Sequence, residues 1–279
     1  MKFYQTAILA SSIVFVLSCT KDTKEILSSE TEAEQIIRQL SDSDNLDGVL
    51  FVSETEYQSY PKLFAEEMPA IQAQFLENRS NIKILKTPKV ANLGKEGTCL
   101  PFAMGYVGVS YLLHTTKGMP YEALEMMPDT ISKSVELRAI RSPEYIYNAA
   151  KISGDCDAGC YPYTVLQYLK SSGVCSLEEM PYSDENGCKT MPSTMQKERA
   201  KVGKVTSYGT VQKKAHEIKK FISLGYPVIF AQCLNDNFYT QAVKAPFIYH
   251  TSGGNLRGGH AYAVIGYDDK REVFIAQNS

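Results

Sequence analysis

Cys99 is the residue best suited to nucleophilic chemistry, because a glycine-bearing loop delivers it to the start of a helix. Residues 92–103 read Asn-Leu-Gly-Lys-Glu-Gly-Thr-Cys-Leu-Pro-Phe-Ala. Gly94 and Gly97 permit backbone conformations that other residues resist, and Pro101 fits a first helical turn but not a deeper one. A helix is therefore predicted to begin at about Thr98 or Cys99, so that Cys99 lies where free amide groups and the helix dipole favour a thiolate. The alternative is that Cys99 is a small buried hydrophobic residue, as free cysteines often are.

His260 and Asn278 are the candidates for the groups that a thiol nucleophile needs, a base and a residue that orients the base. His260 opens a predicted strand, which turns through residues 268–270 into a second strand that ends at Asn278. If those residues form a three-residue hairpin loop, Tyr267 pairs with Arg271 and the same register puts His260 opposite Asn278. Both side chains then lie on one face of the sheet, and a slip of one residue would separate them.

An asparagine suits this position chemically. Its side-chain oxygen can accept from one imidazole N–H and leave the other ring nitrogen to face the thiol. The remaining histidines, His114, His216 and His250, occupy sequence settings typical of solvated or capping side chains. The alternative for His260 is that Gly-Gly-His simply begins a strand.

The elements that must position these residues change in character along the chain. Helices dominate the first half and strands the second, which favours an α+β protein with two lobes and a cleft between them. Beyond Cys99, helices are predicted after Ser142-Pro143, after Pro162 and over 213–224, strands over 204–208, 226–232 and 261–267, and an irregular region over 174–191.

Composition limits the classes of function. The chain has 279 residues, 44% of them hydrophobic, so it can bury a substantial core. The net charge of −2 and the absence of basic clusters with interleaved aromatics give no reason to expect a nucleic-acid partner. The sequence does not indicate an oligomeric state.

The first residues resemble a bacterial lipoprotein export signal. Lys2 precedes an apolar run over about 7–17, and Val-Leu-Ser-Cys ends at Cys19. We therefore expect residues 1–18 to be a signal peptide and no element of the fold, and Cys19 to carry the lipid. The protein would then be exported and membrane-anchored, at the periplasmic face or the cell surface. The alternative is an ordinary signal peptide with a chance cysteine.

Residues 19–81 form a separate N-terminal segment. A capping-box pattern predicts a short helix after Ser29, Val49 to Val52 could form a strand, and residues 62–78 are helix-like but interrupted by Pro69. The segment could be a tether, an edge subdomain or an inhibitory propeptide, and these alternatives stay open. Residues 82–279 form the main domain.

From about Lys89 to Ser279 the chain resembles the papain-like cysteine peptidases, specifically the bacterial branch without a disulfide beside the nucleophile. Residues 92–103 are similar to the family's Asn-Gln-Gly-x-x-Gly-Ser-Cys-x-x-Phe-Ala. The stretches 142–148, 168–176 and 225–228 also match family patterns, as do Gly-Gly-His-Ala at 258–261 and Gln-Asn-Ser at 277–279.

The resemblance implies a helical lobe with Cys99, an antiparallel β-rich lobe with His260 and Asn278, and a cleft that binds an extended peptide. It implies a peptide or protein substrate and acyl transfer through a thioester, with no metal and no organic cofactor. Gly159 stands where the family contacts the substrate backbone.

Two departures from the family matter. Leu93 stands where the family has its oxyanion glutamine, and a leucine has no hydrogen-bond donor. The sequence ends at Ser279 and contains no Trp, where the family continues with a Trp and further strands. We therefore expect the C-terminal part of the β lobe to be incomplete in this sequence.

Besides Cys19 and Cys99, five cysteines remain: Cys156, Cys160, Cys175, Cys188 and Cys233. In an exported protein one or two disulfides are expected among them, with no pairing favoured. A zinc site is the alternative, but no paired Cys-x-x-Cys spacing accompanies it.

The leading interpretation is an exported, lipid-anchored cysteine peptidase with Cys99, His260 and Asn278 as its catalytic residues. A catalytically weak or inactive descendant that binds peptides or proteins is the main rival, because of Leu93. A thiol acyltransferase that uses the same Cys and His is a third hypothesis.

Overall fold

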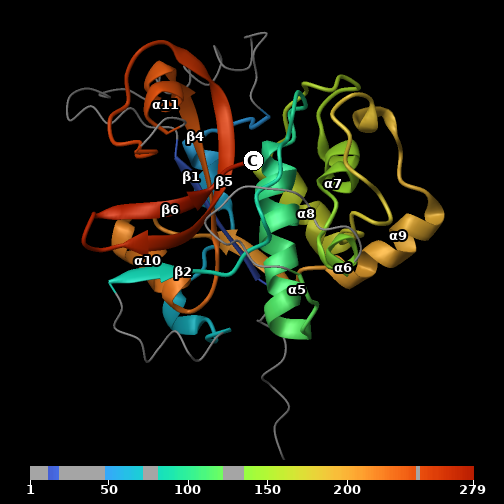
Figure 1. Cartoon of the computed structure of the whole chain (residues 1–279), viewed down its shortest axis with the longest axis horizontal. Coiled ribbons are helices and arrows are strands. Elements are labelled where there is room, and N and C mark those ends of the chain that lie inside the picture. Colours follow the sequence, from blue (N-terminus) through green and yellow to red (C-terminus); the bar gives the residue numbers. More distant parts are fainter. Residues whose placement is uncertain (1–11, 19–47, 72–80, 122–134, 243–245) are drawn as a thin grey trace, which may run out of the picture.

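The computed structural model describes residues 12–18, 48–71, 81–121, 135–242 and 246–279. Within those residues the chain forms two lobes, one helical and one built on a sheet, as the α+β prediction required (Figure 1). The predicted short helix after Ser29 and the lipidation site Cys19 lie outside the described residues. None of the described helices combines the length and the apolar character needed to cross a membrane.

The helical lobe is organised around one continuous helical stretch. It consists of α4 (Cys99–Pro101), the π-helix η2 (Phe102–Val109) and α5 (Ser110–Lys117). The predicted start at Cys99 is confirmed. The π-helical part was not predicted. Directly after it, the Ser110 hydroxyl of α5 donates to the Gly105 carbonyl of η2 at 3.4 Å.

Two further helices of this lobe were predicted from their caps. Ser142 accepts a hydrogen bond from the Tyr145 N–H at 3.2 Å and so caps the helix that begins at Pro143, and the next helix begins at Pro162 as expected. The remaining elements are short. The helices of this part of the chain are α6 (Val135–Ala139), α7 (Pro143–Ala150), α8 (Pro162–Ser171), η3 (Gly187–Lys189), α9 (Thr194–Ala200) and η4 (Lys201–Gly203).

The second lobe is a sheet with the strand order β2-β5-β4-β1-β3. Outside this order, β6 also pairs with β5. β4 and β5 are antiparallel, and two helices accompany the sheet. The predicted strands and helix of this half exist with boundaries shifted by a few residues. The elements are β1 (Ser12–Ser18), β2 (Ile82–Ile84), β3 (Ser207–Thr210), α10 (Ala215–Ser223), β4 (Val228–Asn235), α11 (Asp236–Gln241), β5 (Leu256–Asp268) and β6 (Val273–Gln277).

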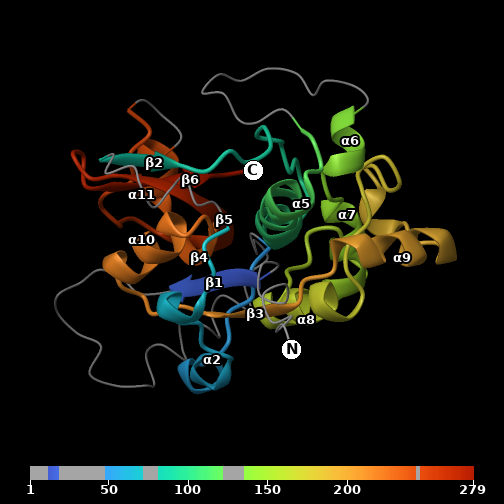
Figure 2. The same cartoon turned by 90° about the horizontal axis from the view of Figure 1, so that it is seen from below.

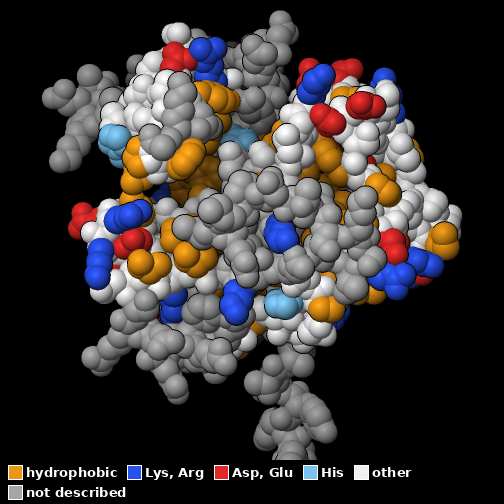
Figure 3. All heavy atoms as spheres, in the orientation of Figure 1, with side chains coloured by type: hydrophobic (Ala, Val, Ile, Leu, Met, Phe, Trp, Pro, Cys, Tyr) orange, Lys and Arg blue, Asp and Glu red, His pale blue; other side chains and the backbone are white. Residues whose placement is uncertain are grey.

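The core lies where the sheet meets the long helical stretch. Both views show α5 between the sheet and α7, with α10 and α11 on the sheet side (Figures 1 and 2). Ile229, Ala261 and Ala263 of β4 and β5 are fully buried, and Gly108 of η2 lies next to the Ile229 side chain. On the face in Figure 3, charged side chains of both signs are dispersed over the described part of the surface, in keeping with the small net charge.

Residues 12–18 differ from expectation, because they form β1 and pair in parallel with both β3 and β4. The prediction that the apolar leader contributes no fold element is therefore wrong for this part of it. Its physical basis is composition, since a run rich in β-branched and aromatic residues has high strand propensity. The export role of residues 1–18 stays a prediction.

The hairpin of β5 and β6 also differs from the predicted register. Tyr267 pairs with Phe274, not Arg271, because the connecting loop is longer than expected. Asp268 Oδ1 accepts the N–H groups of Lys270 and Arg271, and Glu272 adopts a positive φ of 55°. An irregularity between Val264 and Gly266 then moves the pairing back by one residue, so the offset from the predicted register falls from three residues to two.

The N-terminal segment packs against both lobes. It contains α2 (Glu54–Ser59) and η1 (Ala65–Glu67), and the helix expected over 62–78 is reduced to η1 within the described residues. Tyr57, Tyr60 and Met68 are buried in the core. Backbone hydrogen bonds also link residues 61–63 to Thr210 of β3.

Candidate active site

Cys99 lies at the N-terminal end of the long helical stretch and is 2% exposed. The preceding loop turns at Gly94, whose φ of +62° lies in the left-handed region that favours glycine. The Asn92 side-chain oxygen accepts the Gly94 N–H at 2.9 Å and fixes this turn. The thiol therefore stands at the N-terminal end of the helix, where the helix dipole favours negative charge.

Tyr182 holds the two ends of this loop. Its hydroxyl donates to the Leu93 carbonyl at 2.5 Å and lies 3.0 Å from the Thr98 hydroxyl. Burial raises the pKa of Tyr182 well above its usual value, so the side chain remains a donor at any physiological pH. Tyr182, which is distant in sequence, thus fixes the conformation of the loop that leads to Cys99.

His260 sits on β5 with 7% of its surface exposed. Its Nε2 lies 2.6 Å from Oδ1 of Asn278. Because the amide oxygen can only accept, Nε2 carries the hydrogen and Nδ1 is the nitrogen with a lone pair for proton transfer. The ring lies between Phe238 and Tyr262, with centroids 6.1 Å and 6.3 Å away.

His260 and Asn278 come together although the predicted register was wrong. After the irregularity in β5, Ala263 pairs with Gln277, which places Asn278 two residues away from the predicted alignment. A shift of two keeps a side chain on the same face of a sheet, so the residues are diagonal neighbours where direct opposition was predicted. Gln277 anchors this strand end, since its amide bonds the Thr87 hydroxyl at 2.6 Å and the Pro88 carbonyl at 2.8 Å.

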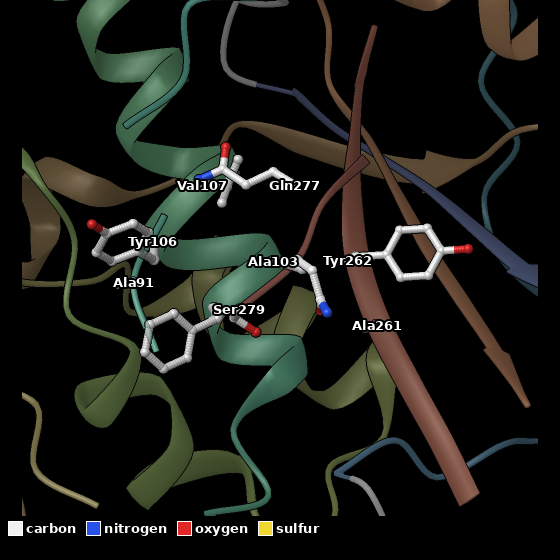
Figure 4. A pocket seen from close by; sticks show the side chains of 10 residues that line it. Ala91, Ala103, Tyr106, Val107, Ala261, Tyr262, Gln277 and Ser279 are labelled. Atoms are coloured by element: carbon white, nitrogen blue, oxygen red, sulfur yellow. The ribbon is translucent and has the colours of Figure 1, made fainter. Parts of the chain in front are cut away.

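A pocket adjoins Asn278 between η2 and β5 (Figure 4). Ala103 and Val107 line it from the helix, Ala261 lines it from the strand, and Gln277 borders it. The pocket is small, and its lining residues come from both lobes. It therefore lies where the two lobes meet, next to the candidate site.

The N-terminal segment occupies the space beside Cys99. A Cβ on Gly48 would fall 2.8 Å from Sγ of Cys99. The next residue, Val49, donates its N–H at 3.3 Å to the carbonyl of Gly259, which directly precedes His260. Residues 48 and 49 therefore lie between the thiol and the strand that carries the histidine.

The same segment pairs with the helical lobe through Cys160. The Cys160 N–H donates to the Gly48 carbonyl at 2.9 Å, and its carbonyl accepts the Leu50 N–H at 3.0 Å. These two bonds form a parallel bridge between Val49 and Cys160. Gly159, the residue expected to contact a substrate backbone, instead faces the Leu50 side chain and accepts the Ile152 N–H at 3.1 Å.

Cys160 was assigned by sequence only to a set of cysteines that could form disulfides, and its backbone role was missed. The signal was its position directly after Gly159. Its thiol is free and fully buried. Burial, with a smaller contribution from Cys99, raises the pKa of Cys160 far above its usual value, so this thiol stays protonated.

Within the described residues, one group of potential metal ligands is close together. Single ligand atoms of Glu96, Cys156 and Cys188 lie within 4.8 Å of one another. Cys156 and Cys188 are joined in a disulfide, so neither sulfur is a thiolate and the group is not a metal site. One of the disulfides expected in an exported protein is thus present.

Comparison with known proteins agrees with this architecture. A family model described as papain family cysteine protease matches residues 93–279. The chain is 26% identical over 135 residues to an uncharacterised peptidase C1-like protein of Acanthamoeba polyphaga mimivirus, which covers 45% of this chain. The match spans 43% of the viral protein, so it extends over less than half of that relative's length.

A solved structure of a cysteine protease has the same fold. Xylellain, a cysteine protease from Xylella fastidiosa, is 20% identical, with a TM-score of 0.58 over 75% of this chain and 77% of its own. A cysteine protease of Carica candamarcensis in complex with E-64 is 17% identical, with a TM-score of 0.46 over 70% of this chain and 78% of its own. The match to xylellain confirms the two-lobe papain-like fold predicted from the sequence.

Proposed function

Because this chain belongs to the papain family of cysteine proteases, we propose that it hydrolyses peptide bonds with Cys99 as nucleophile, His260 as base and acid, and Asn278 as orienting residue. The observation that carries the proposal is the hydrogen bond of 2.6 Å between His260 Nε2 and Asn278 Oδ1. It occurs on the strand that packs against the helix start at Cys99. No metal or organic cofactor takes part in the proposed reaction.

The reaction proceeds by acyl transfer. His260 Nδ1 takes the proton of the Cys99 thiol, Sγ attacks the peptide carbonyl carbon, and His260 then gives the proton to the departing amine. Water attacks the thioester, with His260 again accepting a proton, and the carboxylic acid leaves as the thiol is restored. The backbone N–H of Cys99 stabilises the oxyanion, whereas the Leu93 side chain contributes no donor.

We infer that residues 48–52 close the cleft. Support comes from the contacts of Gly48, Val49 and Leu50 with Cys99, Gly259 and Cys160, which bring this segment beside the thiol. Of the alternatives for residues 19–81, these contacts favour an inhibitory segment. We call residues 48–52 the cleft segment.

Cleavage of a fluorogenic peptide tests the proposed activity. The cleft segment is first released, either by limited proteolysis or by the substitution Gly48→Ala. The protein with Cys99 intact should then hydrolyse the peptide, and the same protein with Cys99→Ala should not. Cys175→Ala is the matched control, because Cys175 is also a buried free thiol but lies outside the site. Equal hydrolysis by the wild type and Cys99→Ala would refute the proposal.

We also propose that the protein is an exported lipoprotein anchored through Cys19. The support is the sequence Val-Leu-Ser-Cys after an apolar run. Processing before Cys19 would remove β1 from between β3 and β4. Mass spectrometry of the membrane fraction should find an acylated N-terminal Cys19, and an unprocessed chain that begins at Met1 would contradict the proposal.

A further inference from the structure

Glu96 is a buried carboxyl three residues before Cys99. Its side chain is 3% exposed, Oε1 accepts the Cys188 N–H at 3.0 Å, and Oε2 has no hydrogen-bond partner. An ionised carboxyl with an unpartnered oxygen is costly to bury. The catalytic steps described above do not use this group, so its burial calls for another explanation.

The residue after Glu96 is tied to the same disulfide. The Gly97 N–H donates to the Cys156 carbonyl at 3.0 Å, and Cys156 is bonded to Cys188. We call residues 92–98, which precede Cys99, the nucleophile loop. Two successive residues of this loop therefore hydrogen-bond to the two cysteines of one disulfide. The Gly97 tie is made by backbone alone, whereas the Glu96 tie depends on a side chain that can gain or lose a proton.

A second buried carboxyl faces the same segment, residues 183–190. Glu144 of α7 is 1% exposed, its Oε2 accepts the Ser183 N–H at 3.3 Å, and its Oε1 has no partner. One helical turn later, Asn148 donates to the carbonyls of Gly187 and Thr190, while its Oδ1 is also unpartnered. Glu96, Glu144 and Asn148 thus present three buried acceptor oxygens without a donor.

The surrounding charges do not compensate for two ionised carboxyls. Lys151 is the cation that acts on both, and its Nζ is bound to the Cys188 carbonyl at 2.5 Å. Asp184 adds negative charge near Glu96. Two tyrosine hydroxyls also face the cluster. Tyr182 slightly offsets the increase that burial causes in the pKa of Glu96, but its hydrogen is donated to the Leu93 carbonyl. Tyr147 donates to the Cys156 and Ala158 carbonyls.

A bound proton would supply the missing donor. Burial raises the pKa of Glu144 to about 7, with a further contribution from Glu96, and burial also raises the pKa of Glu96. The Asn148 side chain partly offsets this rise in the pKa of Glu144. Both amide hydrogens of Asn148 already serve the Gly187 and Thr190 carbonyls, so its Oδ1 is left to accept from a protonated Glu144.

We propose that Glu96 is a positioning residue for Cys99, and that residues 183–190 hold the nucleophile loop in place only while the Glu96–Glu144 pair carries a proton. The proton leaves as the pH rises, so the loop loosens and peptidase activity falls on the alkaline side. The kinetic part of this inference rests on the proposed function, whereas the structural part does not.

The test compares Glu144→Gln, Glu96→Gln and Glu96→Ala with the wild type between pH 5 and 9. Glu178→Gln is the matched control, because Glu178 is exposed and pairs with Arg138 on the surface. The first readout is the hydrogen-exchange protection factor of the Gly97 and Cys188 amides, which requires no activity. The second is the pH profile of kcat/KM for a fluorogenic peptide, measured on the protease with its cleft open.

In the wild type and the control, both protection and kcat/KM should fall at least fivefold between pH 6 and pH 8. Glu144→Gln should move this alkaline limb upward by at least one pH unit. Glu96→Gln, which keeps the acceptor oxygen, should retain most of the activity at pH 6, and Glu96→Ala should lose at least tenfold. Wild-type protection that is independent of pH, or an alkaline limb unmoved by Glu144→Gln, would overturn the inference. If no variant hydrolyses peptide, the proposed function fails while the exchange data still decide this inference.

Discussion

At the residue scale, the account depends on the orientation of one imidazole. Asn278 fixes it through a single hydrogen bond to Nε2, and Gln277 fixes the strand end that carries Asn278. Neither residue needs to reach the substrate. The chemistry of a weakly acidic thiol thus depends on the hydrogen bonds of a strand terminus.

Asn278→Ala removes the acceptor for Nε2, and the ring can then rotate or change tautomer. A positioned base contributes roughly 10²- to 10⁴-fold to the rate, and a misaligned ring loses part of this. We therefore expect kcat to fall by at least about 10-fold. Asn278→Asp is the control, because it keeps an acceptor oxygen and should lose less. Steady-state peptide hydrolysis measures both, and an undiminished kcat in Asn278→Ala would contradict the assigned role.

Leu93→Gln tests the missing oxyanion donor. A glutamine at this position should add a donor for the developing negative charge, which is typically worth about 10²- to 10³-fold in kcat. We expect a gain of at least about 10-fold, since the loop evolved around a leucine. Met191→Gln is the control for a new surface amide, because Met191 is exposed and outside the site. A lower kcat in Leu93→Gln would indicate that another group already fills this role.

Sequence alone predicted Cys99, His260 and Asn278 as the catalytic residues because their chemistry and spacing are local properties. It failed on the register, since the Asp268 turn and the irregularity beside Val264 have no clear sequence signal. The same-face prediction survived because the two errors left a net shift of two residues. Cys160 was missed because a backbone contact does not depend on residue type.

At the scale of elements, the proposed access to the site depends on the helix that begins at Cys99 and on the cleft segment. The helix start was predictable from Gly94, Gly97 and Pro101, which restrict the backbone locally. The cleft segment was not, because Val49 pairs with Cys160 and contacts Gly259, more than a hundred residues away in sequence. Such contacts are fixed by the tertiary fold.

Gly48→Ala should open the cleft. The residue has φ +77°, and a Cβ would fall 2.6 Å from the Gly97 carbonyl oxygen and 2.8 Å from Cys99 Sγ. The left-handed conformation alone costs about 1–2 kcal/mol, which corresponds to roughly 10-fold in the open fraction. We therefore expect Cys99 to react about 10-fold faster with iodoacetamide.

Gly154→Ala is the matched control, since its Cβ would meet nothing within 4 Å and its φ is not positive. Its rate of alkylation should equal the wild-type rate. A Gly48→Ala rate no higher than this control would show that residues 48–52 do not limit access to the thiol. Thermal unfolding of both variants checks that the fold is retained.

At the scale of the whole molecule, segments that are distant in sequence tie the two lobes together. Residues 53–71 bury Tyr57, Tyr60 and Met68 and hydrogen-bond to β3, so they belong to the core and not to a loose tether. The disulfide joins two loops of the helical lobe that both contact the nucleophile loop. The two-lobe class was predictable from the order of helices and strands, but these ties were not.

The disulfide between Cys156 and Cys188 should contribute to global stability, because it closes a loop with a sequence separation of 32. The chain-entropy model gives about 3–4 kcal/mol for a loop of this length. Replacing both cysteines by serine should lower the free energy of unfolding by about that amount in urea titrations. Cys175→Ser is the control for a buried thiol, and a double variant no less stable than it would contradict the estimate.

The most direct test of the central claim is covalent labelling by a peptidyl epoxide, with the modified residue located by mass spectrometry. The account predicts one adduct at Cys99, formed faster in Gly48→Ala and strongly slowed in His260→Ala, with Cys160 and Cys175 unmodified. A folded Gly48→Ala protein that forms no adduct at Cys99 would contradict the account, as would an adduct whose rate is unchanged in His260→Ala.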